Sequence, residues 1–117
     1  MKKNIYVAET GSLFTETVKL NKVYEVITVS IGYEVSGIAK NERNVCYYED
    51  FFNTDVLNIT TTFDELVPVS YKGELIKIKW FLTIEKIQKN KDDSKTVTDR
   101  MDFLMYPKNY AKYLEKK

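Results

Sequence analysis

The sequence predicts an all-β fold, an antiparallel β-sandwich of about seven strands with a short C-terminal helix. Apolar and polar residues alternate with a period of two over several long runs. Turn-forming residues separate these runs at intervals of about ten to fifteen residues, and no segment between them has the 3.6-residue period of a long helix. We find no linker and no internal repeat, so we expect a single domain over residues 1–117.

Four runs carry the alternation. The first spans Val23–Val35, the second Leu57–Phe63, the third and clearest Ile76–Glu85, and the fourth Val97–Met105, where Asp99 interrupts the pattern. One face of each run is expected to be buried. The residues that we expect on these buried faces are Ile27, Val29, Ile31, Tyr33, Val35, Leu57, Ile59, Phe63, Ile76, Ile78, Trp80, Leu82, Ile84, Val97, Met101, Phe103 and Met105.

Turns and two short helices complete the prediction. Turn signals occur at Thr10-Gly11-Ser12, Leu20-Asn21-Lys22, Ser36-Gly37, Ser70-Tyr71-Lys72-Gly73 and in the polar stretch 89–95. Tyr47–Asn53 could form one or two helical turns. At the C-terminus, Pro107 suits a first helical position, and the following residues would place Tyr110, Tyr113 and Leu114 on one stripe.

The composition argues against catalysis and metal binding. Histidine, the commonest general base and metal ligand, is absent. Cys46 is the single cysteine, so it can form no disulfide within the chain and belongs to no zinc-ligand pattern. The four glycines are scattered and form no phosphate-binding loop. We therefore predict no enzyme activity, no cofactor and no metal site, and we expect Cys46 to be a small buried hydrophobe.

Charge and hydropathy indicate the compartment. Eighteen basic and seventeen acidic residues leave a formal net charge of +1, which gives no overall field for nucleic acid or anionic lipid. Glu9 breaks the apolar N-terminal stretch too early for a signal peptide, and no run approaches the roughly 20 apolar residues of a membrane span. We expect a cytoplasmic protein that does not enter a membrane.

An aromatic and acidic segment is the leading candidate for a binding site. Tyrosine, which offers a large contact area at low entropic cost, occurs nine times in the chain. The predicted patch consists of Tyr47, Tyr48, Glu49, Asp50, Phe51 and Phe52. We predict a non-enzymatic protein-binding module that uses a sheet edge or this loop patch, for example a small inhibitor or adaptor for a basic partner.

Two alternative functions remain open. Basic and aromatic residues interleave around Tyr71-Lys72 and again from Tyr106 onward, a pattern that suits a single-stranded nucleic acid. The candidate residues for that function are Lys77, Lys79, Phe81, Lys108, Tyr110 and Lys112. Phe81 could instead be covered by a loop or by the C-terminal helix. The second alternative is a structural subunit whose exposed strand edges pair with copies of itself.

One stretch resembles a known family. Phe63–Gly73 contains a proline and ends in Ser, an aromatic residue, Lys and Gly, and it leads into the alternating strand Ile76–Ile84. This arrangement is similar to the arrestin-like β-sandwich domains, including the bacterial sporulation-control proteins, and also to immunoglobulin-like strands. The resemblance implies a seven-stranded sandwich with a binding or scaffolding role and no active site of its own. It identifies no functional residue.

Overall fold

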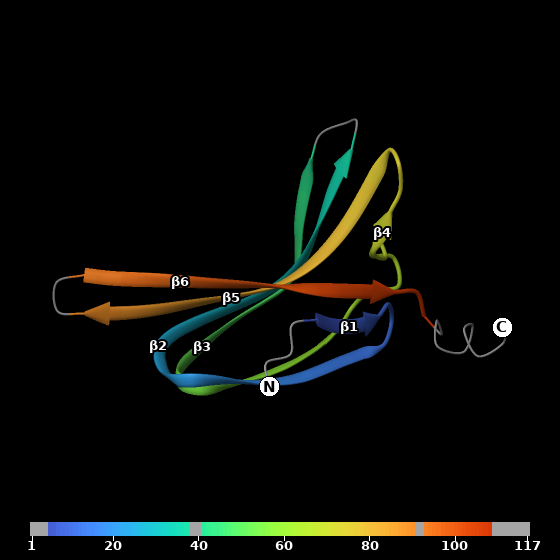
Figure 1. Ribbon diagram of the computed structural model, residues 1–117. Coiled ribbons are helices and arrows are strands. Elements are labelled where there is room, and N and C mark those ends of the chain that lie inside the picture. Colours follow the sequence, from blue (N-terminus) through green and yellow to red (C-terminus); the bar gives the residue numbers. More distant parts are fainter. Residues whose placement is uncertain (1–4, 38–40, 91–92, 109–117) are drawn as a thin grey trace.

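The computed structural model describes residues 5–37, 41–90 and 93–108, and this part of the chain is all-β with no helix. Six strands form one mixed sheet in the order β1-β6-β5-β2-β3, with β4 paired to β5 (Figure 1). The strands are β1 (Ile5–Glu9), β2 (Leu13–Gly37), β3 (Glu42–Thr62), β4 (Tyr71–Lys72), β5 (Ile76–Asn90) and β6 (Asp93–Tyr106). All neighbouring strands are antiparallel except β1, which runs parallel to β6.

A bend in the long β2–β3 hairpin gives the sheet its shape. Lys19 pairs with Val56 and Tyr24 with Thr54, so the residues 20–23 of β2 lie opposite a single residue of β3. Near this bulge Asn53 has a φ of 50°, a left-handed conformation that asparagine tolerates better than most residues. Figure 1 shows β2 and β3 turning together at this point, so that the sheet curls into a half-barrel.

The core fills the concave side of this half-barrel and is rich in aromatic rings. The ring centroids of Phe14 and Phe103 are 5.1 Å apart, and those of Phe63 and Trp80 are 5.6 Å apart at an interplanar angle of 75°. Such edge-to-face contacts add to the hydrophobic gain from burial. Trp80 is 1% exposed, and its indole Nε1 donates to the carbonyl oxygen of Pro68 at 2.9 Å. The loop before β4 is thereby fixed over the core.

The predicted alternation is confirmed over most of the four runs. The predicted inward residues that are buried are Ile27, Val29, Ile31, Leu57, Ile59, Phe63, Trp80, Leu82, Ile84, Phe103 and Met105. Tyr33, Ile78 and Met101 pack partly against the core. Ile76 is 50% exposed and Val97 is 41% exposed, because the strands extend beyond the core at these positions.

The all-β prediction is therefore confirmed, but the architecture differs from a two-sheet antiparallel sandwich of about seven strands. The turn signal Leu20-Asn21-Lys22 lies inside β2, where it forms the bulge rather than a connection between strands. The single strand β2 thus occupies the region where we expected two strands. One curled sheet encloses the core that we expected between two facing sheets. The parallel pairing of β1 was not predicted, since period-two patterns carry no information on strand direction.

Two local predictions are wrong and one cannot be compared. Tyr47–Asn53 belongs to β3 and is not helical, because its aromatic residues pair in register with β2. Cys46 is exposed rather than buried. The predicted C-terminal helix, with Tyr110, Tyr113 and Leu114, lies outside the described residues.

Candidate functional site

β3 forms one edge of the sheet. In the described part of the chain it has a strand neighbour on one side, β2, and none on the other. In an antiparallel pair, alternate residues direct their N–H and C=O groups away from the partner strand, so a free edge presents a row of backbone donors and acceptors. Most side chains of the segment Glu42–Asn53 are exposed, and none is buried. We call this segment the β3 edge.

The predicted patch lies on the β3 edge, but it is divided between two faces. Tyr47, Glu49 and Phe51 pair with Ile31, Val29 and Ile27 and therefore share the face of the core. Tyr48, Asp50 and Phe52 pair with Ser30, Thr28 and Val26 and lie on the outer face. The structure thus brings the six residues onto one strand but not into one surface patch.

The outer face of the β3 edge combines apolar surface with negative charge. Val45, Tyr48 and Phe52 are each about 60% exposed, with values of 59%, 64% and 63%. The carboxylate of Asp50 accepts a hydrogen bond of 2.7 Å from Thr28 Oγ1, which holds it between the two aromatic residues of this strand. Among the described residues, no ion pair involves Asp50. Its charge is therefore available to a cationic group.

The core-side face of the same strand is partly closed by its own contacts. Tyr47 and Phe51 pack against the core. The Tyr47 hydroxyl donates to Glu49 Oε2 at 3.1 Å. Burial, together with this hydrogen bond and the charge of Glu49, raises the pKa of Tyr47 to about 12. Tyr47 therefore stays protonated and holds Glu49 at neutral pH, and the outer face is the more accessible of the two.

A second irregularity occurs in the β3 edge, at Cys46. Ile31 pairs with Tyr47 and Gly32 with Val45, so Cys46 is the extra residue of a bulge. A Cβ on Gly32 would lie 2.2 Å from the carbonyl oxygen of Asn44, so the close approach of the two strands requires glycine here. Although Cys46 is exposed, desolvation by the atoms around it raises the pKa of its thiol, whereas an activated cysteine nucleophile has a lowered pKa.

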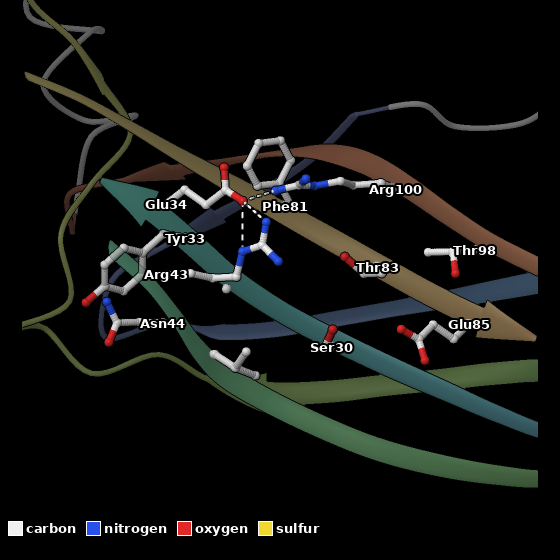
Figure 2. A pocket seen from close by; sticks show the side chains of 12 residues that line it. Ser30, Tyr33, Glu34, Arg43, Asn44, Phe81, Thr83, Glu85, Thr98 and Arg100 are labelled. Carbon is white, nitrogen blue, oxygen red and sulfur yellow. Dashed lines mark hydrogen bonds and ion pairs between the residues drawn. The ribbon is translucent and has the colours of Figure 1, made fainter. Parts of the chain in front are cut away.

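Beside the β3 edge, a hollow of about 270 Å³ opens on the outer face, with Gly32 and Phe81 among its lining residues (Figure 2). Figure 2 shows two arginines from different strands converging on Glu34. Arg43 Nε donates to Glu34 Oε1 at 2.9 Å, and Arg100 Nη2 donates to the same oxygen at 2.7 Å. The hydrogen bond from Arg100 is the main reason that the pKa of Glu34 lies below its ordinary value. The hydrogen bond from Arg43 and the charges of both arginines lower it further.

Glu34, Arg43 and Arg100, which we call the Glu34 cluster, connect the three strands β2, β3 and β6. Arg43 belongs to β3, Glu34 to β2 and Arg100 to β6, and the guanidinium of Arg100 lies 3.5 Å from the ring centroid of Phe81 on β5. Both arginines that line the hollow are therefore already paired with the carboxylate of Glu34. The Glu34 cluster links the β3 edge to β2 and β6.

The residues predicted for nucleic-acid binding are only partly brought together. Lys77, Lys79 and Phe81 alternate along one face of β5, as the sequence suggests. The ring of Phe81 is half-buried beneath Arg100, so a base would have to displace the arginine to stack there. Lys108 lies elsewhere and forms an ion pair of 2.8 Å with Glu65. Tyr110 and Lys112 lie outside the described residues.

No group of three or more candidate metal ligands occurs in the described ranges. Within the same ranges, no helix has the length and apolar character needed to cross a membrane. No family model matches the chain, and no curated protein matches it.

Sequence reasoning missed the Glu34 cluster. Glu34, Arg43 and Arg100 are far apart along the chain, and each alone is an ordinary surface charge. They meet because the register places Glu34 opposite Arg43 and because Arg100 reaches across β5. To predict such a cluster one would need to know the strand order, and the period-two pattern of the sequence does not give it.

Proposed function

We propose that this chain is a non-enzymatic protein-binding module that adds an extended, basic segment of a partner to the β3 edge. In this mode, the backbone of the edge strand supplies hydrogen bonds, and the side chains beside it select the sequence. The observation that carries the proposal is the position of β3 at the end of the sheet, with the segment Glu42–Asn53 free of a second strand neighbour among the described residues.

Charge supports a basic partner. β3 contains four carboxylates and one guanidinium, and the guanidinium, that of Arg43, is paired with Glu34 of β2. A lysine or arginine of an added strand would lie near Asp50 on the outer face, between the rings of Tyr48 and Phe52. Aromatic rings next to a carboxylate suit a basic side chain, since the ring faces attract the cation and cover its aliphatic stem.

The same charges disfavour the pairing of β3 with a second copy. In an antiparallel homodimer whose two-fold axis passes near Glu49 and Asp50, these carboxylates would lie close to the carboxylates of the copy. Like charges opposite one another on adjacent strands are destabilising. The arrestin-like resemblance of Phe63–Ile84 stays a prediction, and the binding role that it implies agrees with this proposal.

Selection from a library of short random peptides tests the proposal. We expect the enriched peptides to alternate apolar and basic residues, because an added strand presents every second side chain to each face. Binding should be lost in the double variant Tyr48→Ala/Phe52→Ala and weakened in Asp50→Asn.

Tyr71→Ala provides the matched control, because Tyr71 is a strand tyrosine with 56% exposure that lies away from β3. Peptides that bind the Tyr48→Ala/Phe52→Ala variant as tightly as the unmodified protein would refute the proposal. So would the loss of binding in Tyr71→Ala alone.

A further inference from the structure

The sheet divides at one end of β5. β4 pairs with β5 at Lys77 and Ile78, whereas β6 pairs with β5 only from Trp80 onward. Ser70 fixes the start of β4 to β6: its backbone N–H donates to the Met105 carbonyl oxygen at 2.8 Å, and its Oγ accepts from the Met105 N–H at 2.9 Å. Figure 1 shows β4 between β6 and the end of β5 at this division.

A hollow of about 400 Å³ opens at the division, and we call it the β4–β6 hollow. Four aromatic residues line it: Tyr71 from β4, Trp80 from β5, and Phe103 and Tyr106 from β6. Trp80 and Phe103 are each 1% exposed and offer almost no accessible surface, so the accessible aromatic surface belongs mainly to Tyr71, which is 56% exposed, and to the half-buried Tyr106. Aromatic walls of this kind favour a flat, apolar group over a polar one.

Lysines dominate the charged part of the lining. Lys72, Lys77 and Lys79 line the hollow, together with one carboxylate, that of Asp102. In the described ranges, none of the three lysines forms an ion pair. This distinguishes the β4–β6 hollow from the hollow at Glu34, where both arginines are paired with one carboxylate. Three cations beside accessible tyrosine rings match an anion that carries a ring.

We propose that the β4–β6 hollow binds a planar aromatic anion, namely the base and phosphate of a nucleotide. The base would lie against the rings of Tyr71 and Tyr106, and the phosphate would lie on the lysines. Base stacking on tyrosine accepts any base, and lysine contacts carry no base preference, so the site would bind nucleotides with little selectivity. The inference is independent of the β3 edge, which lies at the other end of the strand order.

Two sources can supply this chemistry, a free nucleotide or one unit of a single strand. Trp80 is the single tryptophan of the chain and lines the β4–β6 hollow, so its fluorescence reports on the site directly. We would titrate AMP and, separately, a short oligothymidylate. We expect saturable quenching of Trp80 with at least one of them, and the stronger of the two ligands identifies the source. Equilibrium dialysis with labelled AMP and labelled oligothymidylate at millimolar concentration provides a measurement that does not depend on fluorescence.

Charge-matched variants test the position of the site. Lys72→Ala/Lys79→Ala removes two exposed lysines of the hollow and should weaken binding by about tenfold. Lys19→Ala/Lys22→Ala removes the same charge near the bend of β2 and should leave binding unchanged. Failure of both ligands to bind in the titration and in dialysis would overturn the inference. Equal weakening in the two variants would also overturn it, because it would indicate general electrostatic attraction.

Discussion

Replacement of Glu34 by glutamine removes the charge on which Arg43 and Arg100 converge while keeping the shape of the side chain. In the native protein, both guanidinium groups donate to Glu34 Oε1, with Arg100 Nη2 at 2.7 Å and Arg43 Nε at 2.9 Å. Glu34→Gln therefore breaks two ion pairs at once. It leaves Arg100 stacked on Phe81.

The expected loss is modest, because the cluster lies at the surface. The side chains of Arg43 and Arg100 are 69% and 42% exposed. Surface ion pairs contribute about 0.2–1 kcal/mol each, so we expect Glu34→Gln to lower the free energy of unfolding by about 1 kcal/mol at neutral pH. A favourable geometry on one shared carboxylate places the value toward the upper part of that range.

The effect should depend on pH with a defined sign. The arginine contacts lower the folded-state pKa of Glu34 below its ordinary value of 4.5. The stabilisation is thus complete above pH 4.5 and disappears as the pH falls through the folded-state pKa. The difference between Glu34→Gln and the unmodified protein should therefore be present at pH 7 and shrink below about pH 4.

Urea unfolding followed by Trp80 fluorescence measures this difference in the free energy of unfolding at pH 7 and at pH 3. Glu85→Gln is the control, since Glu85 lines the same hollow and forms no ion pair with the residues that the structure describes. The reasoning is refuted if Glu34→Gln is no more destabilising than Glu85→Gln at pH 7. It is also refuted if the full loss persists at pH 3.

Three further predictions concern packing, backbone and thiol chemistry. Leu82→Ala, at a fully buried position, should lower the free energy of unfolding by about 2–5 kcal/mol, whereas Leu66→Ala, at a position that is 91% exposed, should change it by less than about 0.5 kcal/mol in urea titrations. Gly32→Ala should cost about 1–3 kcal/mol, because its Cβ would meet the Asn44 carbonyl oxygen; an unchanged urea midpoint would contradict the assigned bulge. Cys46 should react slowly with iodoacetamide at pH 7, and its rate should still be rising with pH at its ordinary pKa of 9.0; a rate that levels off at or below pH 9 would contradict the raised pKa.

Local patterns in the sequence predicted the class of the fold and much of its core. The alternation around Trp80 and Leu82 identifies the buried face of β5, because a strand with one face in the core and the other in water alternates apolar and polar side chains. The same logic failed at Leu20-Asn21-Lys22, where residues typical of a turn occupy a bulge inside a continuous strand. Whether such residues end a strand or bend it depends on pairing with β3, which is a long-range property.

The candidate site was predicted in composition but not in geometry. Tyr48 and Phe52 of the predicted patch are exposed, but a strand directs Tyr47 and Phe51 to the opposite face. The division of the sheet at β4, by contrast, could not be predicted, because it depends on the contact between Ser70 and Met105 across a long stretch of chain. A two-residue strand such as β4 leaves no periodic signal in the sequence.

Amide hydrogen exchange of the free protein, measured by NMR residue by residue, tests the central claim most directly. If β3 is a free edge, the amides between Glu42 and Asn53 should alternate between slow exchange, where they donate to β2, and fast exchange, where they face water. Neighbouring amides in the middle of β2, which has strands on both sides, should all exchange slowly. Uniform slow exchange along Glu42–Asn53 would contradict the account, because it would mean that another strand already occupies the β3 edge.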